Sequence, residues 1–308
     1  MSLPGLAAAD CGLRGIRTVQ GMTHALSARQ PVNTATVPHR SPFRYPGGKT
    51  WLVPQVRRWM DSRPTKPQVF VEPFAGGGSI GLTVAAENLA ERVVLCELDP
   101  NVAGVWQVLI HGDAEALARK IEQFQISREN VIAELNRKRR SPVNRAFQTI
   151  LRNRVQRGGV MAPGAGLMRA GENGKGVASR WYPSTLARRI RDLQTYRARI
   201  EFIHGDGFDV IESYKNDPEA VFFIDPPYTA GGKRAGSRLY EQSAIDHVRL
   251  FELSASCAGD VLLTYDNAPE VLELARSAGF ATKPIAMRST HNAEMSELLI
   301  GRDLSWVA

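Results

Sequence analysis

The stretch of sequence that decides the fold is Val69–Ser79, VFVEPFAGGGS. Its first four residues are β-branched, aromatic or acidic and are typical of a short strand. Three consecutive glycines, Gly76–Gly78, follow, and the next residues predict a helix over Ile80–Asn88. A strand, a glycine turn and a helix open many nucleotide-binding α/β sheets, because glycines leave room for a ligand at the helix N-terminus. The candidate ligand-binding residues of this turn are Pro73, Phe74, Ala75, Gly76 and Gly78.

The second predicted strand, Arg92–Glu97, ends in an acidic residue about 20 positions after the glycine turn. In Rossmann-like sheets a carboxylate at this place binds ribose hydroxyls, and we assign that role to Glu97. Its neighbour Asp99 fits the N-cap of a helix that begins at Pro100. The alternative is that both acids serve only as caps.

A third predicted strand, Val221–Ile224, runs directly into Asp225, Pro226, Pro227 and Tyr228. Prolines cannot donate to a strand ladder, so this group stands at the carboxyl end of the strand, where ligands bind in open α/β sheets. Asp225 and the Pro226 carbonyl are two acceptors for one exocyclic amino group, and the Tyr228 ring offers a stacking face. This chemistry suits a nucleobase amine that attacks an electrophile. The alternative is an ordinary Asp-Pro turn.

Two further stretches are candidates for ligand contact. Tyr45 and Lys49 flank a glycine pair at the start of an amphipathic helix, which fits an anionic or aromatic ligand or, alternatively, a simple helix cap. Asp206 and Phe208 follow a predicted strand at Ile200–Ile203 and are candidates to contact an adenine ring. Here the alternative is a turn and a helix cap. We expect the remaining strands near residues 261–264, 282–287 and 297–301.

The positive charge of the chain is concentrated in one internal segment. The whole chain has a net charge of +8, but residues 115–200 hold 19 basic and 6 acidic residues, a net of +13. The rest of the chain holds 20 basic and 25 acidic residues, a net of −5. Such asymmetry favours a helical segment that faces nucleic acid, and the alternative is a solvated helical surface. The candidate DNA-binding residues are Arg139, Arg140, Arg145, Arg152, Asn153, Arg154 and Arg157, with Lys233 and Arg234 from a glycine-containing loop after Tyr228.

Composition narrows the class of protein. Three scattered cysteines are no disulfide framework and fit a reducing compartment. The six histidines show no metal-ligand spacing with them, so we expect no metal. No run of 18 apolar residues predicts a membrane span, and the N-terminus lacks the features of a signal peptide. Residues 1–40 have no periodicity and are expected to be a disordered extension.

Taken together, these motifs resemble the Dam-type, class-alpha family of DNA N6-adenine methyltransferases. The matching stretches are Arg44–Lys49, Val71–Ser79, Glu97–Pro100 and Asp225–Tyr228. Weaker matches are Gly205–Phe208, the stretch from Tyr240 to Leu250, Leu263–Asn267 and Glu297–Ile300. They occur in the family's order and cover about residues 42–110 and 200–302.

The resemblance implies an α/β, Rossmann-like methyltransferase sheet with S-adenosylmethionine as donor. The implied catalytic domain is 41–112 plus 200–308, and 113–199 is the implied basic, mainly helical target-recognition domain. The implied donor contacts are Tyr45, Lys49, the glycine turn, Glu97, Asp206 and Phe208, while Asp225–Tyr228 would hold a flipped-out adenine of duplex DNA. The Asn153–Gly159 stretch matches the recognition pattern of the best-known Dam members only loosely, so the resemblance does not assign the site GATC.

Several functions remain open at this point. The expected activity is site-specific adenine methylation in the cytoplasm of a bacterial or phage-infected cell, at the nucleoid, and a cognate restriction nuclease is one partner that the resemblance allows. Cytosine-N4 or RNA base methylation fits the same acceptors. A catalytically silent DNA-binding protein would keep the fold without turnover. A nicotinamide-dependent dehydrogenase explains the glycine turn but neither Asp225–Tyr228 nor the basic segment.

Overall fold

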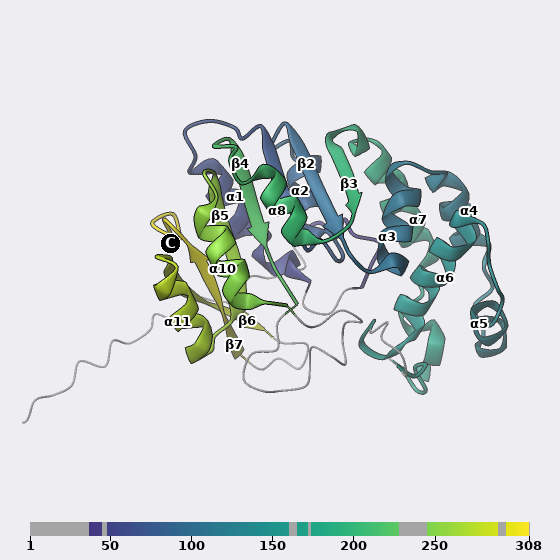
Figure 1. Cartoon of the computed structure of the whole chain (residues 1–308). Coiled ribbons are helices and arrows are strands. Elements are labelled where there is room, and N and C mark those ends of the chain that lie inside the picture. The colour runs from purple at the N-terminus through teal and green to yellow at the C-terminus, as the bar shows by residue number, and fades with distance from the viewer. Residues whose placement is uncertain are drawn as a thin grey trace, which may run out of the picture.

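The computed structural model describes residues 37–44, 48–159, 165–171, 174–227, 245–288 and 294–307 (Figure 1). These residues contain a seven-stranded sheet with the strand order β3-β2-β1-β4-β5-β7-β6. β7 pairs antiparallel with β5 and β6, and the other pairs are parallel. The strands are β1 (Val69–Glu72), β2 (Arg92–Glu97), β3 (Ile200–His204), β4 (Ala220–Ile224), β5 (Asp260–Asp266), β6 (Ala281–Arg288) and β7 (Glu294–Gly301). The α/β fold class predicted from the sequence is confirmed.

The central strands are buried on both faces, as parallel strands require. Every residue of β1 and β4 is buried. In β1 and β4, alternate side chains enter two hydrophobic clusters, one on each face: Phe70 and Phe223 lie in one, Val71 and Phe222 in the other. The run of apolar β-formers that predicted these strands therefore reflects a two-sided core.

Helices cover both faces of the sheet (Figure 1). On one face the core includes side chains from η2 (Lys49–Leu52), α1 (Val53–Asp61), α2 (Ser79–Ala86) and α3 (Pro100–Ile110). On the other face it includes side chains from α8 (Gly207–Tyr214), α10 (His247–Ser256) and α11 (Pro269–Ser277). The carboxyl ends of β1, β2, β3 and β4 meet at one edge of the sheet, because these strands are parallel neighbours.

The described residues between α3 and β3 are mainly helical and lie beyond β3 at one end of the sheet (Figure 1). Their elements are α4 (Ala114–Gln123), α5 (Arg128–Leu135), α6 (Pro142–Val155), η3 (Arg157–Gly159), η5 (Gly176–Arg180), α7 (Pro183–Gln194) and η6 (Arg197–Arg199). We call this segment the helical insert. Buried side chains of α4, α6 and α7 share one core with α3 and with one face of the sheet. The predicted boundary between residues 112 and 113 thus marks where the chain leaves the sheet domain, but the hydrophobic core continues across it.

The last residues of the predicted N-terminal extension are packed against the sheet domain. Val37 is buried in the core, and the Arg40 guanidinium lies 2.9 Å from Glu87 Oε1. The expectation that disorder extends to residue 40 is therefore corrected for residues 37–40, because an apolar contact and an ion pair hold them. Residues 1–36 lie outside the described residues. No helix in the described ranges is both long and apolar enough to span a membrane.

Candidate active site

The structure holds Asp225 between two neighbouring elements at the carboxyl edge of the sheet. β4 ends at Ile224, and the two prolines that follow Asp225 prevent further ladder pairing. Thr264, fully buried on the adjacent strand β5, donates its hydroxyl hydrogen to Asp225 Oδ1 over 2.8 Å. The sequence match Leu263–Asn267 includes Thr264 but assigns it no role, because its contact with Asp225 arises only from the pairing of β4 with β5.

Lys49 joins the same oxygen from the other side. Its Nζ lies 2.9 Å from Asp225 Oδ1 and 3.4 Å from Glu297 Oε2. The Lys49 side chain is only 4% exposed, so this ammonium is neutralised inside the protein. The sequence predicts that Lys49 contacts the donor, and the structure places its ammonium against Asp225, which the sequence predicts as the amine acceptor.

Two further buried carboxyl groups lie near this ion pair, Glu72 at the end of β1 and Glu297 on β7. Glu72 Oε2 accepts a hydrogen bond from the Gly81 backbone N–H over 2.7 Å. Burial raises the pKa of Glu72 to about 8, with a further upward contribution from the charge of Asp225. Burial also raises the pKa of Glu297 to about 7, against the opposing effect of Lys49. The sequence match Glu297–Ile300 includes this residue but assigns it no role, although an acidic residue inside an apolar strand is a signal for one.

The glycine turn and Glu97 form a second part of the site. Gly76 donates its N–H to Glu97 Oε2 over 2.9 Å, and the Asp99 N–H is 2.8 Å from Glu97 Oε1. Burial raises the pKa of Glu97 to about 7, although these backbone N–H groups act in the opposite direction. Gly78 has φ +61°, and a Cβ there would lie 2.8 Å from the Trp106 ring, so this position requires glycine. Asp99 caps α3 by accepting from the N–H groups of residues 101 and 102.

The turn after β3 packs directly against the glycine turn. Asp206 Oδ1 accepts from the Phe208 N–H over 2.9 Å and so caps α8. The Phe208 and Phe74 rings meet edge to face with centroids 6.1 Å apart. The Arg249 guanidinium lies 4.8 Å from the Phe208 centroid and covers part of this ring. The predicted donor-binding residues Pro73, Phe74, Ala75, Gly76, Gly78, Glu97, Asp206 and Phe208 therefore gather at one sheet edge, next to the β4 end that carries Asp225.

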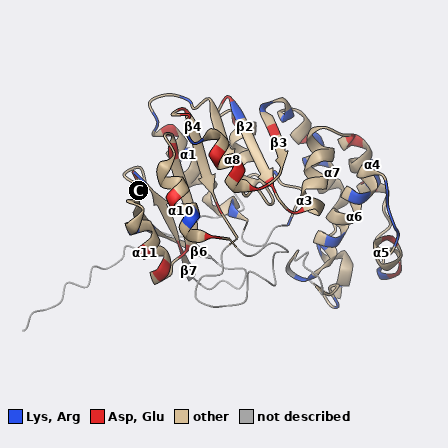
Figure 2. Ribbon diagram, viewed as in Figure 1, with Lys and Arg blue, Asp and Glu red and all other residues tan. Residues whose placement is uncertain are grey.

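The predicted DNA-facing residues divide into exposed and buried groups. Arg140, Arg145 and Arg157 are exposed, and Arg152 is partly exposed. Arg139 donates to both oxygens of Glu134, at 3.1 and 2.5 Å, so its charge is partly offset. Figure 2 shows basic segments on α6 and α7 of the helical insert.

Asn153 and Arg154 are buried, and their assignment as DNA contacts is corrected. Asn153 bonds both the N–H and the C=O of Arg44, and Arg154 donates to the Pro42 carbonyl. Their polarity suggested a surface, but the packing of α6 against residues 41–44 turns them inward. Tyr45, Tyr228, Lys233 and Arg234 lie outside the described residues, so their predicted roles stay predictions. In the described ranges no three His, Cys, Asp or Glu side chains form a group able to hold a metal ion.

Comparison with known proteins identifies a family whose sequence profile matches this chain. The sequence profile of the D12 class N6 adenine-specific DNA methyltransferases matches residues 45–290. Modification methylase LlaI of Lactococcus lactis subsp. lactis is 23% identical over 221 residues, which is 66% of this chain and 32% of the relative. The DNA N-6-adenine-methyltransferase of Escherichia phage P1 is 25% identical over 262 residues, 81% of this chain and 33% of the relative. The chain thus spans about a third of the length of these curated relatives.

Among solved structures, the rRNA methyltransferase aviRa of Streptomyces viridochromogenes superposes with a TM-score of 0.36 and 15% sequence identity. The superposition covers 82% of this chain and 84% of that one. This overlap is too slight to add to what the strand order already shows.

Proposed function

The chain belongs to the D12 class N6 adenine-specific DNA methyltransferase family, and on this premise we propose that it methylates N6 of a flipped-out adenine in duplex DNA. The observation that carries the proposal is Asp225, which stands at the carboxyl end of β4 with one oxygen held by Lys49 and Thr264. The glycine turn follows β1, the strand beside β4, and Glu97 ends β2, the next strand along the sheet. An amine acceptor and a nucleotide-binding edge thus lie on neighbouring strands, as a transfer between two bound nucleosides requires.

The residues at the β1, β2 and β3 ends fit S-adenosylmethionine as the donor. Glu97 places a carboxylate at the end of β2, where ribose hydroxyls are bound in Rossmann-like sheets. Gly207 packs so tightly that a Cβ on it would lie 2.5 Å from the Pro73 carbonyl oxygen. This close packing joins the turn after β3 to the glycine turn around the Phe74 and Phe208 rings. Rings and a carboxylate on adjacent turns suit an adenosyl group. When bound, this donor supplies an electrophilic methyl group on a sulfonium.

Asp225 would act on the target base through its second oxygen. Oδ1 already accepts from Lys49 and Thr264, which leaves Oδ2 to face the N6 amino group. The Pro226 carbonyl is the second acceptor, and Tyr228 would stack on the base. Two acceptors on N6 localise its lone pair on nitrogen for attack, and the Lys49 cation stabilises the negative charge on Asp225. The side chains thus contribute positioning and electrostatics, and the excess N6 proton is released to solvent after the methyl group has been transferred.

The helical insert would bind the DNA that carries the target base. Its net charge and its exposed arginines, Arg140, Arg145 and Arg157, suit phosphate groups. The adenine must leave the stack to reach Asp225, at a cost of a few kcal/mol. We therefore expect affinity for DNA to fall steeply with salt concentration.

The test is product analysis with a matched inactive variant. Purified protein is incubated with S-adenosylmethionine and unmethylated DNA, the DNA is digested to nucleosides, and methylated nucleosides are identified by mass spectrometry. We expect N6-methyladenine from the wild type and none from Asp225→Ala, which retains donor binding by calorimetry. N4-methylcytosine as the product, or equal turnover by both proteins, would refute the proposal, and methylation of RNA alone would redirect it.

We further propose that this methylation protects DNA in a bacterial or phage-infected cell from cleavage by a cognate restriction nuclease. The support is that one relative is named a modification methylase and another comes from a phage. DNA from cells expressing the wild type, but not Asp225→Ala, should then resist that nuclease. The role would be contradicted if restriction nucleases that adenine methylation normally blocks cut the DNA from both kinds of cell equally.

A further inference from the structure

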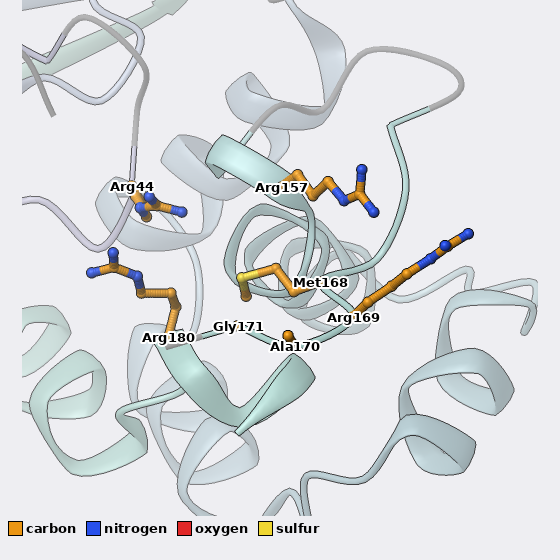
Figure 3. Close-up of a pocket in the computed structure, with 7 residues that line it drawn as sticks. All are labelled: Arg44, Arg157, Met168, Arg169, Ala170, Gly171 and Arg180. Atoms are coloured by element: carbon orange, nitrogen blue, oxygen red, sulfur yellow. The ribbon is translucent and has the colours of Figure 1, made fainter. Parts of the chain in front are cut away.

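Four arginines line one hollow at the junction of residues 41–44 and the helical insert (Figure 3). The hollow has a volume of about 400 Å³ and is lined by Arg44, Arg157, Met168, Arg169, Ala170, Gly171 and Arg180. Arg44 and Arg180 lie at one side of Met168, and Arg157 and Arg169 lie at the other (Figure 3). The described lining residues include no aspartate or glutamate. The sequence-based set of DNA contacts contained only Arg157 of these four arginines.

The backbone around the hollow is held by hydrogen bonds, three of them made by the buried side chain of Asn153. Asn153 accepts from the Arg44 N–H over 2.8 Å, and its Nδ2 donates to the carbonyls of Arg44 and Gly159 over 2.9 and 3.0 Å. Gly159 has φ +77°, and a Cβ there would lie 2.4 Å from the Arg44 carbonyl oxygen. The Arg157 N–H also bonds the Gly166 carbonyl over 3.1 Å. The hollow is thus a preformed feature of the fold.

The surroundings of the hollow are strongly positive. Burial, followed by the charges of Arg189, Arg44 and Arg180, lowers the pKa of the neighbouring Arg154. An arriving anion would relieve this repulsion. Guanidinium groups bind phosphate in bidentate geometry, and their ordering on two sides suits an extended anion better than a small one.

We propose that this arginine hollow is a seat for the sugar-phosphate backbone of the DNA, shared by the Ser41–Arg44 segment and the helical insert. The proposal rests on the proposed function for the identity of its ligand. Arg157 and Arg169 contact phosphate from one side, Arg44 and Arg180 from the other, and the Met168 side chain lies between them.

The position of the hollow relates the bound phosphate to the target base. Arg44 precedes Lys49 by five residues, which span at most about 18 Å when extended. Lys49 in turn contacts Asp225. Since each base pair advances the helix by about 3.4 Å, the phosphate belongs to the few base pairs that flank the target.

The experiment measures the salt dependence of duplex binding by fluorescence anisotropy. The variants are Arg169→Ala and Arg157→Ala, whose side chains are exposed, and their double variant. The matched control is Arg276→Ala, which removes the same charge from α11, where the side chain is 75% exposed. Lost phosphate contacts lower the slope of log K against log salt by about 0.9 each, which is about eightfold in affinity at 0.1 M salt.

We expect the single variants to lose this much, equally on target-containing and unrelated duplexes, and Arg169→Lys to keep the wild-type slope because it keeps the positive charge. A slope unchanged from Arg276→Ala overturns the proposal. So does a loss confined to one DNA sequence, which indicates base contact instead of phosphate contact. Thermal stabilisation by inorganic phosphate that depends on Arg169, without any change in the DNA slope, assigns the hollow to a free anion and also overturns it.

This outcome is separable from that of the proposed function. Unchanged slopes in a protein that makes N6-methyladenine refute the hollow alone. If the Arg157→Ala and Arg169→Ala slopes are reduced but the wild type methylates no base, the proposed activity is refuted and the hollow remains a DNA-binding site.

Discussion

The hydroxyl of Thr264 offers the sharpest test of how Asp225 is positioned. Thr264→Val replaces a fully buried residue with one of nearly the same shape and removes the 2.8 Å hydrogen bond to Asp225 Oδ1. Hydrogen bonds to charged groups contribute about 1.5–3 kcal/mol. Lys49 still holds the same oxygen at 2.9 Å, so the carboxylate stays in the site but is free to turn.

If that energy orients Oδ2 toward the base, the rate of methyl transfer should fall by about 10- to 150-fold, since 1.4 kcal/mol corresponds to a factor of ten. The assay is single-turnover transfer of labelled methyl groups to duplex DNA at saturating donor. The dissociation constant of the donor, measured by calorimetry, should change by less than about twofold, because Thr264 touches the acceptor side of the site.

Thr83→Val is the matched control. Thr83 is also buried, and its hydroxyl donates to the Ser79 carbonyl over 2.9 Å within α2, away from Asp225. Both variants lose one hydrogen bond, so Thr83→Val should lose about 1 kcal/mol of stability and Thr264→Val, whose acceptor is charged, about 1.5–3 kcal/mol. The reasoning is refuted if Thr264→Val turns over like the wild type, if Thr83→Val is equally slow, or if the loss lies entirely in donor binding.

Two further predictions concern stability. Burial raises the pKa of Glu72 to about 8 from 4.5, so the folded state binds its proton more tightly and the free energy of unfolding should fall as pH rises from about 4.5 to 8. Urea denaturation across this range should show that Glu72→Gln lacks this component, and identical pH profiles would contradict the assignment. Gly78→Ala should destabilise the protein by about 1–3 kcal/mol through its φ of +61° and the clash with Trp106. Gly104→Ala, where a Cβ meets nothing within 4 Å on α3, should raise the melting temperature, and a Gly78→Ala protein as stable as this control would exclude strain at the turn.

Local pattern was sufficient for the sheet because its strands are short apolar runs that glycine, proline or acidic residues end. β4 ends at the prolines after Asp225, and β2 ends at Glu97, as the sequence predicts. The same pattern could not place Glu297. Its strand, β7, inserts antiparallel between β5 and β6, and only this pairing brings Glu297 within 3.4 Å of Lys49, 248 positions earlier in the chain.

The errors at Asn153 and Arg154 have a related cause. An amide and a guanidinium in a run of basic residues have the composition of a nucleic-acid surface. Their burial is decided by a segment more than 100 residues away, whose carbonyls of Pro42 and Arg44 need donors. Side-chain polarity alone does not distinguish a solvent-exposed group from one that satisfies a distant backbone.

That distant segment is where the two halves of the site meet. Three side chains of the helical insert donate hydrogen bonds to carbonyls of residues 41–44: Arg189 to Ser41, Arg154 to Pro42 and Asn153 to Arg44. Five residues further on, Lys49 is bound to Asp225. A shift of the helical insert on binding DNA would therefore move Arg44, and through the short stretch to Lys49 it would move the contact with Asp225. Binding in the arginine hollow and orientation of Asp225 should consequently be coupled. In the doubly substituted protein with Arg169→Ala and Thr264→Val, the losses in transfer rate at subsaturating DNA should deviate from the product of the single losses, whereas strict multiplicativity would show that the two ends act independently.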